Sequence, residues 1–89
     1  GALWENFLMA ERQKMMAYGQ LTANSWFWRT HRQAELDLLE ESDGQLKAFE
    51  FKWNPSQKVK LPKAFAEAYP DATFHVVHPD NFEEFLGLD

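Results

Sequence analysis

The stretch that decides the fold is AELDLLEESDGQLKAFEFKW, residues 34–53. Apolar and polar residues alternate on both sides of Asp43-Gly44, and such alternation is typical of β-strands with one apolar face. An Asp-Gly dipeptide between two alternating runs is a strong signal for a two-residue hairpin turn. The stretch therefore predicts two antiparallel strands joined at Asp43-Gly44.

This hairpin also predicts which residues lie opposite each other. With a two-residue turn, Ser42 faces Gln45, and one face of the hairpin then carries three cross-strand pairs that are entirely apolar, as a buried face should. These pairs are Ala34–Trp53, Leu36–Phe51 and Leu38–Phe49. A slip of one residue would set acids against aromatic rings, so the pattern favours this register.

The other face of the hairpin carries charges. The same register puts Asp37 directly opposite Glu50, and Glu35 opposite Lys52. Carboxylates on directly opposed residues have Cβ atoms roughly 5 Å apart, and like charges there are destabilising. Three arrangements would compensate: one carboxyl group stays protonated, a lysine lies between them, or a divalent cation such as Mg²⁺ bridges them.

Lys52 lies on the same predicted face as Glu50. Its ammonium group could orient a water or stabilise charge on a phosphate, and a metal, a lysine and a phosphate are the usual components of hydrolytic phosphoryl chemistry. Glu5, beside the apolar stripe of the first predicted helix, is a further candidate carboxylate. The competing interpretation is an exposed pair between Lys52 and Glu35, worth only about 0.2–1 kcal/mol.

The remaining chain predicts the order α-β-β-β-α-β-α. Helices are expected at 2–18, 61–69 and 81–86, and strands at 25–30, 34–41, from Gln45 to the break at 54–56, and 73–78. The third strand, second helix and fourth strand form a βαβ unit with parallel strands, whereas the first three strands form an antiparallel meander. The predicted fold is α/β (α+β), with a four-stranded mixed sheet flanked by helices.

Details of these elements are also predicted. Gly19 and Gly87 are expected to end helices, and Asn81 to cap the last one. A three-residue loop at 31–33 would place Arg29 opposite Glu35. The same register would pair two tryptophans of the first strand with leucines of the second, Trp28 with Leu36 and Trp26 with Leu38. The sheet aromatics are expected in the core. They are Trp26, Trp28, Phe49, Phe51 and Trp53.

Composition narrows the class of protein. The chain has 89 residues, of which 45% are hydrophobic and 16% aromatic, so it can form a core. It has no cysteine, hence no disulfide or thiolate metal site. No apolar run approaches the ~20 residues that span a bilayer, and a cytoplasmic location is expected. We expect one domain over residues 1–89, cut from a longer protein, because a helix begins almost at residue 1.

The charge distribution bears on nucleic-acid binding. The net charge of −5 counts against a dominant DNA-binding surface. The one basic cluster comprises Lys58, Lys60 and Lys63, which could contact phosphates or simply face solvent. His75 and His78 are too few and too loosely placed for a zinc site.

Asp37 followed by Glu50-x-Lys52 resembles the PD-(D/E)xK signature of restriction-endonuclease-like nucleases, although Leu36 rather than proline precedes the aspartate. Glu5 on a preceding helix resembles the arrangement in archaeal Holliday-junction resolvases. The resemblance implies a restriction-endonuclease-like α-β-β-β-α-β core. It also implies Mg²⁺ or Mn²⁺ held by Asp37, Glu50 and Glu5, with Lys52 assisting the attacking water in phosphodiester hydrolysis of nucleic acid.

A closer resemblance is to the uncharacterised C-terminal domain of predicted prokaryotic AAA+ superfamily ATPases. Four motifs of that family occur here in the same order: Gly1 with Glu5-Asn6-Phe7, Trp28-Arg29-Thr30, Glu35-Leu36-Asp37 and Glu50-Phe51-Lys52. This resemblance implies an ATPase domain in the same full-length protein, although the chain itself has no G-x-x-x-x-G-K-[ST] motif. The alternative function is a non-catalytic module that keeps the nuclease fold and mediates partner or subunit contacts.

Overall fold

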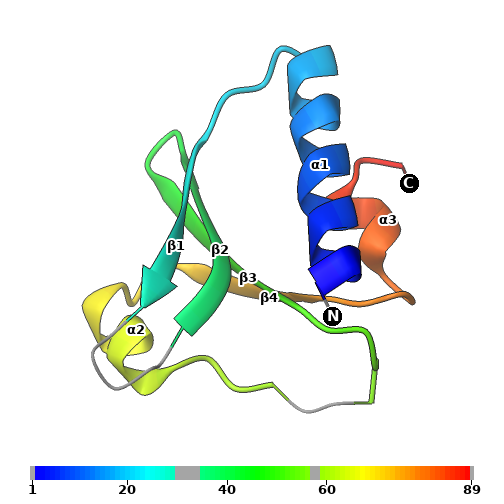
Figure 1. Cartoon of the computed structure of the whole chain (residues 1–89). Helices are drawn as coiled ribbons and strands as arrows, with labels where there is room; N and C mark the ends of the chain where they lie inside the picture. The colour runs from blue at the N-terminus through cyan, green and yellow to red at the C-terminus, as the bar shows by residue number, and fades with distance from the viewer. Residues whose placement is uncertain (1, 30–34, 57–58, 89) are drawn as a thin grey trace. The chain divides into compact units, whose positions relative to one another are not determined.

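The computed structural model describes residues 2–29, 35–56 and 59–88 (Figure 1). Over these residues the element order is the predicted α-β-β-β-α-β-α. The elements are α1 (Ala2–Tyr18), β1 (Asn24–Arg29), β2 (Glu35–Ser42), β3 (Gln45–Phe51), α2 (Lys63–Ala68), β4 (Thr73–Val77) and α3 (Phe82–Phe85).

The chain divides into two compact units. Unit 1 comprises Gly1–Thr22, Phe51–Gln57 and Val77–Asp89, and therefore holds α1 and α3. Unit 2 comprises Ala23–Glu50 and Lys58–Val76, and holds α2 and nearly all of the four strands.

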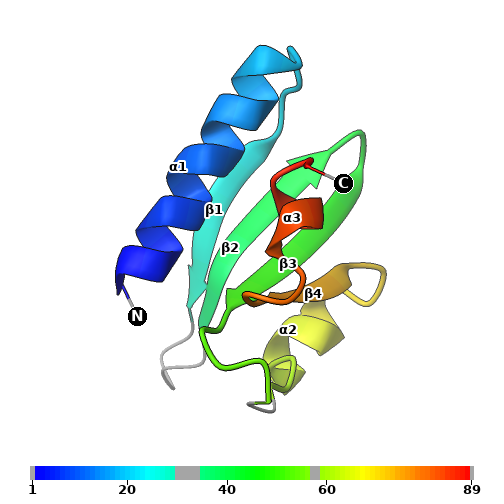
Figure 2. The ribbon, with the colours of Figure 1, turned by 90° about the vertical axis from the view of Figure 1, so that its right-hand side faces the viewer.

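The strands form one sheet in the order β1-β2-β3-β4 (Figure 2). The β1–β2 and β2–β3 pairs are antiparallel, as the meander requires, and the sheet as a whole is mixed, with β3 and β4 as the pair joined through α2. The predicted α+β class with a four-stranded mixed sheet is therefore confirmed. None of the described helices is both long enough and apolar enough to cross a membrane.

The hairpin between β2 and β3 forms as predicted. Asp43 and Gly44 have φ values of 53° and 80°, the two positive φ angles of a type I′ turn. The register runs from Ser42↔Gln45 to Leu38↔Phe49. Because β3 ends at Phe51, the predicted strand pairs of Lys52 and Trp53 do not form. Ala34, the expected partner of Trp53, lies outside the described residues.

The register between β1 and β2 differs from the prediction at one end. Trp28↔Leu36 and Arg29↔Glu35 are paired as expected, and the predicted loop at 31–33 lies outside the described residues. Trp26, however, pairs with Leu39 rather than Leu38, because the register shifts between Trp26 and Trp28. The shift leaves one more residue on β2 than on β1, which is a β-bulge.

The core of unit 2 lies between the sheet and α2. Leu36, Leu39, Ala48 and Phe65 are almost completely buried, and partly buried apolar side chains pack around them. The prediction that all the sheet aromatics are core residues is wrong for two of them. Phe49 and Phe51 are buried, but 43% of Trp26 and 63% of Trp53 are exposed. Trp26 is on the edge strand β1, and Trp53 lies beyond the end of β3.

The core of unit 1 joins α1 to α3. Leu8 is completely buried, and Phe85 and Leu86 at the end of α3 are each only 5% exposed. The Arg12 guanidinium donates a hydrogen bond to the Phe85 carbonyl and lies 4.3 Å from the centroid of the Phe85 ring. A cation at the C-terminal end of a helix is favourable, because the last carbonyl groups have no partners within the helix. Arg12 therefore ties α3 to α1.

The helix ends follow the predicted glycines only in part. The left-handed residue after α1 is Gln20, with φ of 56°, rather than Gly19. Asn81 is at the N-cap position of α3, but its side chain accepts a 2.8 Å hydrogen bond from the His78 N–H instead of capping the helix. Gly87 ends α3 with φ of 71°, as predicted.

The two glycines with positive φ offer a paired stability test. A Cβ on Gly44 would meet nothing within 4 Å, whereas a Cβ on Gly87 would lie 3.1 Å from Met15 Cγ. Gly44→Ala is expected to cost about 1–2 kcal/mol of unfolding free energy from backbone strain alone. Gly87→Ala adds crowding of Met15 and should cost about 1 kcal/mol more. Urea unfolding of both variants measures the difference, and equal losses would contradict the Met15 contact.

Candidate functional site

The structure brings Asp37 of β2 and Glu50 of β3 together within unit 2. The Asp37 backbone N–H donates a 3.1 Å hydrogen bond to Glu50 Oε1. Asp37 is half-buried, and only 9% of Glu50 is exposed. The bond brings the Glu50 carboxylate to the Asp37 main chain, while the regular pairing of β2 with β3 ends at Leu38↔Phe49. Glu50 is therefore not a solvent-facing strand residue.

The bulge in β2 falls at this pair. Opposite β1, the extra residue lies between Leu36 and Leu39, so it is either Asp37 or its neighbour Leu38. A bulge leaves one residue outside the regular ladder and turns its side chain, and bulges are over-represented beside active sites. Beside this irregularity, the Asp37 N–H donates to a side-chain oxygen of the neighbouring strand β3. The hydrophobic pattern of residues 34–41 contained no signal for it.

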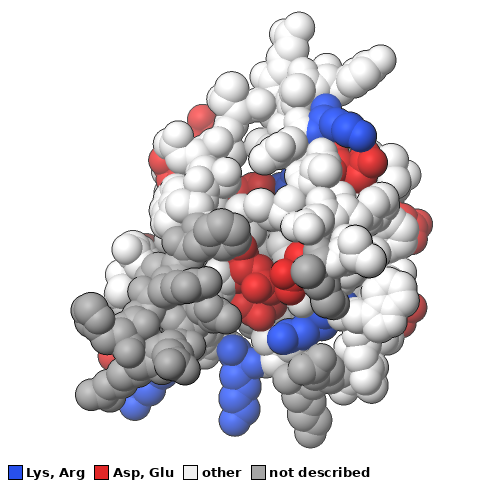
Figure 3. All heavy atoms as spheres, viewed as in Figure 1, with Lys and Arg blue, Asp and Glu red and all other residues white. Residues whose placement is uncertain are grey.

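Among the residues of unit 2 whose burial is described, two carboxylates are buried. Glu40 is 6% exposed and lies opposite Lys47 in the register, so a basic residue is its cross-strand neighbour. The Glu50 carboxylate instead accepts a hydrogen bond from the backbone N–H of Asp37 on the facing strand. Burying a carboxylate is costly unless hydrogen bonds or a cation compensate, so two of them on adjacent strands make this an energetically demanding region. Acidic side chains, in red, gather near the centre of the face shown in Figure 3.

Lys52 and Glu5 belong to unit 1. Lys52 directly follows β3, its backbone N–H donates a 2.9 Å hydrogen bond to the Val77 carbonyl, and its side chain is half-buried. Glu5 is in the first turn of α1 and is also half-buried. The main chain of Lys52 is thus fixed by pairing with the end of β4. Along the chain, Lys52 follows Glu50 by two residues.

The predicted basic cluster is only partly described. Lys58 lies outside the described residues. Lys60 is exposed, and Lys63 is 90% exposed and forms an ion pair of 4.0 Å with Glu67, one turn further along α2. An exposed pair at this spacing contributes about 0.3–0.5 kcal/mol. Lys60 and Lys63 are accessible to solvent, which phosphate contacts would require.

Asp37 and Glu50 both carry carboxylate groups, the ligand type of hard divalent cations. Carboxylate oxygens are the ligands that Mg²⁺ prefers, and Mg²⁺ is usually held by one or two carboxylates while waters complete its shell. Within residues 2–29, 35–56 and 59–88, no group of three His, Cys, Asp or Glu side chains is arranged to hold a metal ion. What the described residues show at this place is the Glu50 carboxylate bonded to the Asp37 main chain.

Comparison with protein families gives one match. The model of DUF4143, a domain of unknown function, matches residues 1–87, and the chain therefore belongs to this family. Neither the curated proteins nor the solved structures gave a match.

Proposed function

We propose that this DUF4143 domain is a nuclease-like domain that hydrolyses phosphodiester bonds of nucleic acid with Mg²⁺ or Mn²⁺. The observation that carries the proposal is the Asp37 N–H hydrogen bond to Glu50 Oε1, beside a strand bulge and with Glu50 buried. The order Asp37, Glu50, Lys52 along the chain is the order of the PD-(D/E)xK signature. The AAA+ resemblance adds an ATPase domain in the same full-length protein.

In this proposal each residue has a separate role. Asp37 and Glu50 would hold the cation, and the resemblance implies Glu5 as a further ligand. When bound, the cation would supply charge neutralisation at the phosphate and a more acidic bound water. The resemblance implies that Lys52 would orient the attacking water. A new P–O bond forms from that water as the bond to the leaving sugar oxygen breaks, and the proton released by the water ends on the leaving oxygen.

The experiment that tests this function is a cleavage assay of Lys52→Ala on single-stranded, duplex and branched DNA and on RNA, with Mg²⁺. Loss of a group that positions the reacting water is expected to reduce cleavage by about 100-fold. Lys47→Ala is the matched control, since Lys47 is an exposed lysine of the preceding strand β3 and should leave cleavage unchanged. Equal cleavage by wild type and Lys52→Ala would refute the proposed role and point to a contaminating nuclease.

A second candidate function is a non-catalytic interaction module. The observation that favours it is the exposure of large apolar residues in unit 1: Leu3 is 88% exposed, Tyr18 94% and Leu88 68%. Exposed apolar side chains are available for contact with a protein partner. The acidic net charge of −5 also suits a protein partner better than a nucleic acid. Absence of cleavage on every substrate, with no effect of Mg²⁺ on stability, would favour this second candidate.

A further inference from the structure

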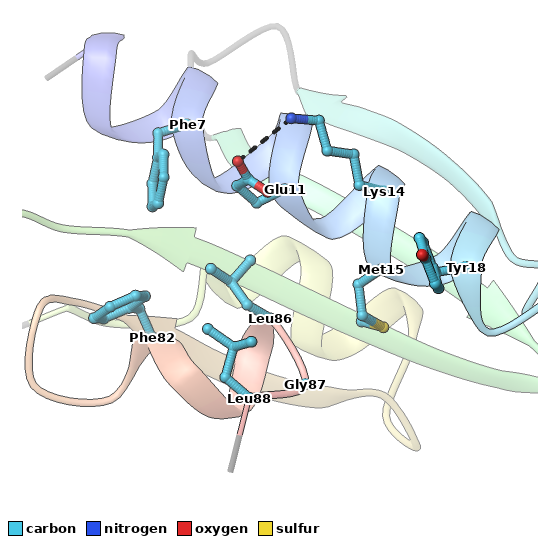
Figure 4. A pocket seen from close by; sticks show the side chains of 9 residues that line it. All are labelled: Phe7, Glu11, Lys14, Met15, Tyr18, Phe82, Leu86, Gly87 and Leu88. Carbon is cyan, nitrogen blue, oxygen red and sulfur yellow. Dashed lines mark ion pairs between the residues drawn. The ribbon is translucent and has the colours of Figure 1, made fainter.

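Unit 1 contains a groove between α1 and the end of α3 (Figure 4). Its volume is about 390 Å³. Apolar side chains form most of its lining, and Glu11 and Lys14 of α1 are the charged residues at its edge, joined by an ion pair of 3.5 Å. The apolar lining residues of α1 are Phe7, Met15 and Tyr18.

Four lining residues of α1 form a line on one side of the helix. Phe7, Glu11, Lys14 and Tyr18 are spaced by four, three and four residues, the spacing of a helix–helix seam. All four are accessible: Phe7 is 45% exposed and Tyr18 94%, and the side chains of Glu11 and Lys14 are 39% and 72% exposed. This line is called the α1 seam below.

The α1 seam is complementary to itself when reversed. A two-fold axis crossing α1 between Arg12 and Gln13 brings position 7 of one helix to position 18 of the other, and position 11 to position 14. Phe7 then meets a tyrosine at each end of the contact, and Glu11 meets a lysine at its centre. A two-fold interface needs this kind of self-complementary surface, because the same patch serves both subunits.

We propose that the α1 seam is a homodimer interface, in which α1 of one chain packs antiparallel against α1 of a second copy. Phe7 and Tyr18 contribute the apolar contacts, and the groove beside them receives the aromatic side chains of the second copy. Two Glu11–Lys14 pairs between the chains fix the antiparallel register, because a parallel arrangement would set like charges against each other. This inference does not depend on the proposed nuclease activity.

A charge-swap experiment tests the proposal. Sedimentation equilibrium of the wild-type chain over the micromolar range should show a concentration-dependent dimer. Glu11→Lys sets two pairs of like charges across the seam and should weaken the dimer by about tenfold. The double variant Glu11→Lys/Lys14→Glu restores both pairs and should return the dissociation constant close to that of wild type.

The matched control is Glu67→Lys. Glu67 is also an exposed helical glutamate with a lysine partner on its own helix, but it lies on α2, in unit 2. Glu67→Lys changes the net charge by the same amount as Glu11→Lys does. It should leave the dissociation constant of the dimer unchanged. A wild-type chain that stays monomeric overturns the proposal. So does a dimer that Glu11→Lys does not weaken, or one that the double variant does not restore.

Discussion

Replacing Asp37 with asparagine is expected to reduce Mg²⁺-dependent cleavage by about 100-fold or more. The amide keeps the size of the side chain and removes its charge, so the site loses an anionic ligand. Losing about 3 kcal/mol of charge stabilisation in the transition state corresponds to such a factor. Initial rates on the best substrate of the wild-type chain, at saturating Mg²⁺, measure the effect.

Glu40→Gln is the matched control for this prediction. Glu40 is a buried carboxylate of the same strand, β2, and its replacement is also a neutral isostere. Its cross-strand neighbour is Lys47 and not Glu50, so its loss should affect stability and leave cleavage within a few fold of wild type. If the two variants lose activity equally, the loss reflects general damage to the sheet and the ligand role of Asp37 is refuted.

Phe65→Ala is expected to lower the free energy of unfolding by about 3–5 kcal/mol. Phe65 is the completely buried side chain of α2, and it packs in the cluster of Leu36, Leu39 and Ala48. Truncation removes the ring from the core and leaves a cavity in unit 2. Urea unfolding monitored by circular dichroism measures the change.

Tyr69→Ala provides the comparison for Phe65→Ala. The Tyr69 ring lies 5.1 Å from that of Phe65, but 45% of the residue is exposed, so its removal should cost much less. A loss for Phe65→Ala below that for Tyr69→Ala would contradict the assignment of Phe65 as the centre of this core.

The hairpin was predictable because local chemistry and cross-strand pattern agree there. The φ values of Asp43 and Gly44 and the Leu38↔Phe49 pair both follow from the sequence. The meeting of Asp37 and Glu50 follows from the same register. A period of two, however, says only which residues share a face. The alternation does not indicate whether the face of β3 that carries Glu50 is buried. The burial of Glu50 was therefore not predictable from the sequence.

Two other features depended on tertiary structure. Because of the bulge beside Asp37, the cross-strand partner of Trp26 is Leu39 and not the predicted Leu38. A one-residue bulge of this kind cannot be recognised from the alternation of apolar residues. On α1, Leu8 and Tyr18 are both large side chains of an apolar helix stripe, but packing buries Leu8 and leaves Tyr18 almost fully exposed. Periodicity identifies an apolar face and cannot tell a core from an interface.

The most direct test of the central claim is a Mg²⁺ titration of thermal unfolding. If Asp37 and Glu50 hold the ion in the native state, Mg²⁺ at about 100 times its dissociation constant should stabilise the wild-type chain by about 2.7 kcal/mol. Asp37→Asn and Glu50→Gln should each abolish most of this stabilisation, while Glu40→Gln should keep it. A wild-type chain whose melting temperature is independent of Mg²⁺, or equal stabilisation of all four proteins, would contradict the account.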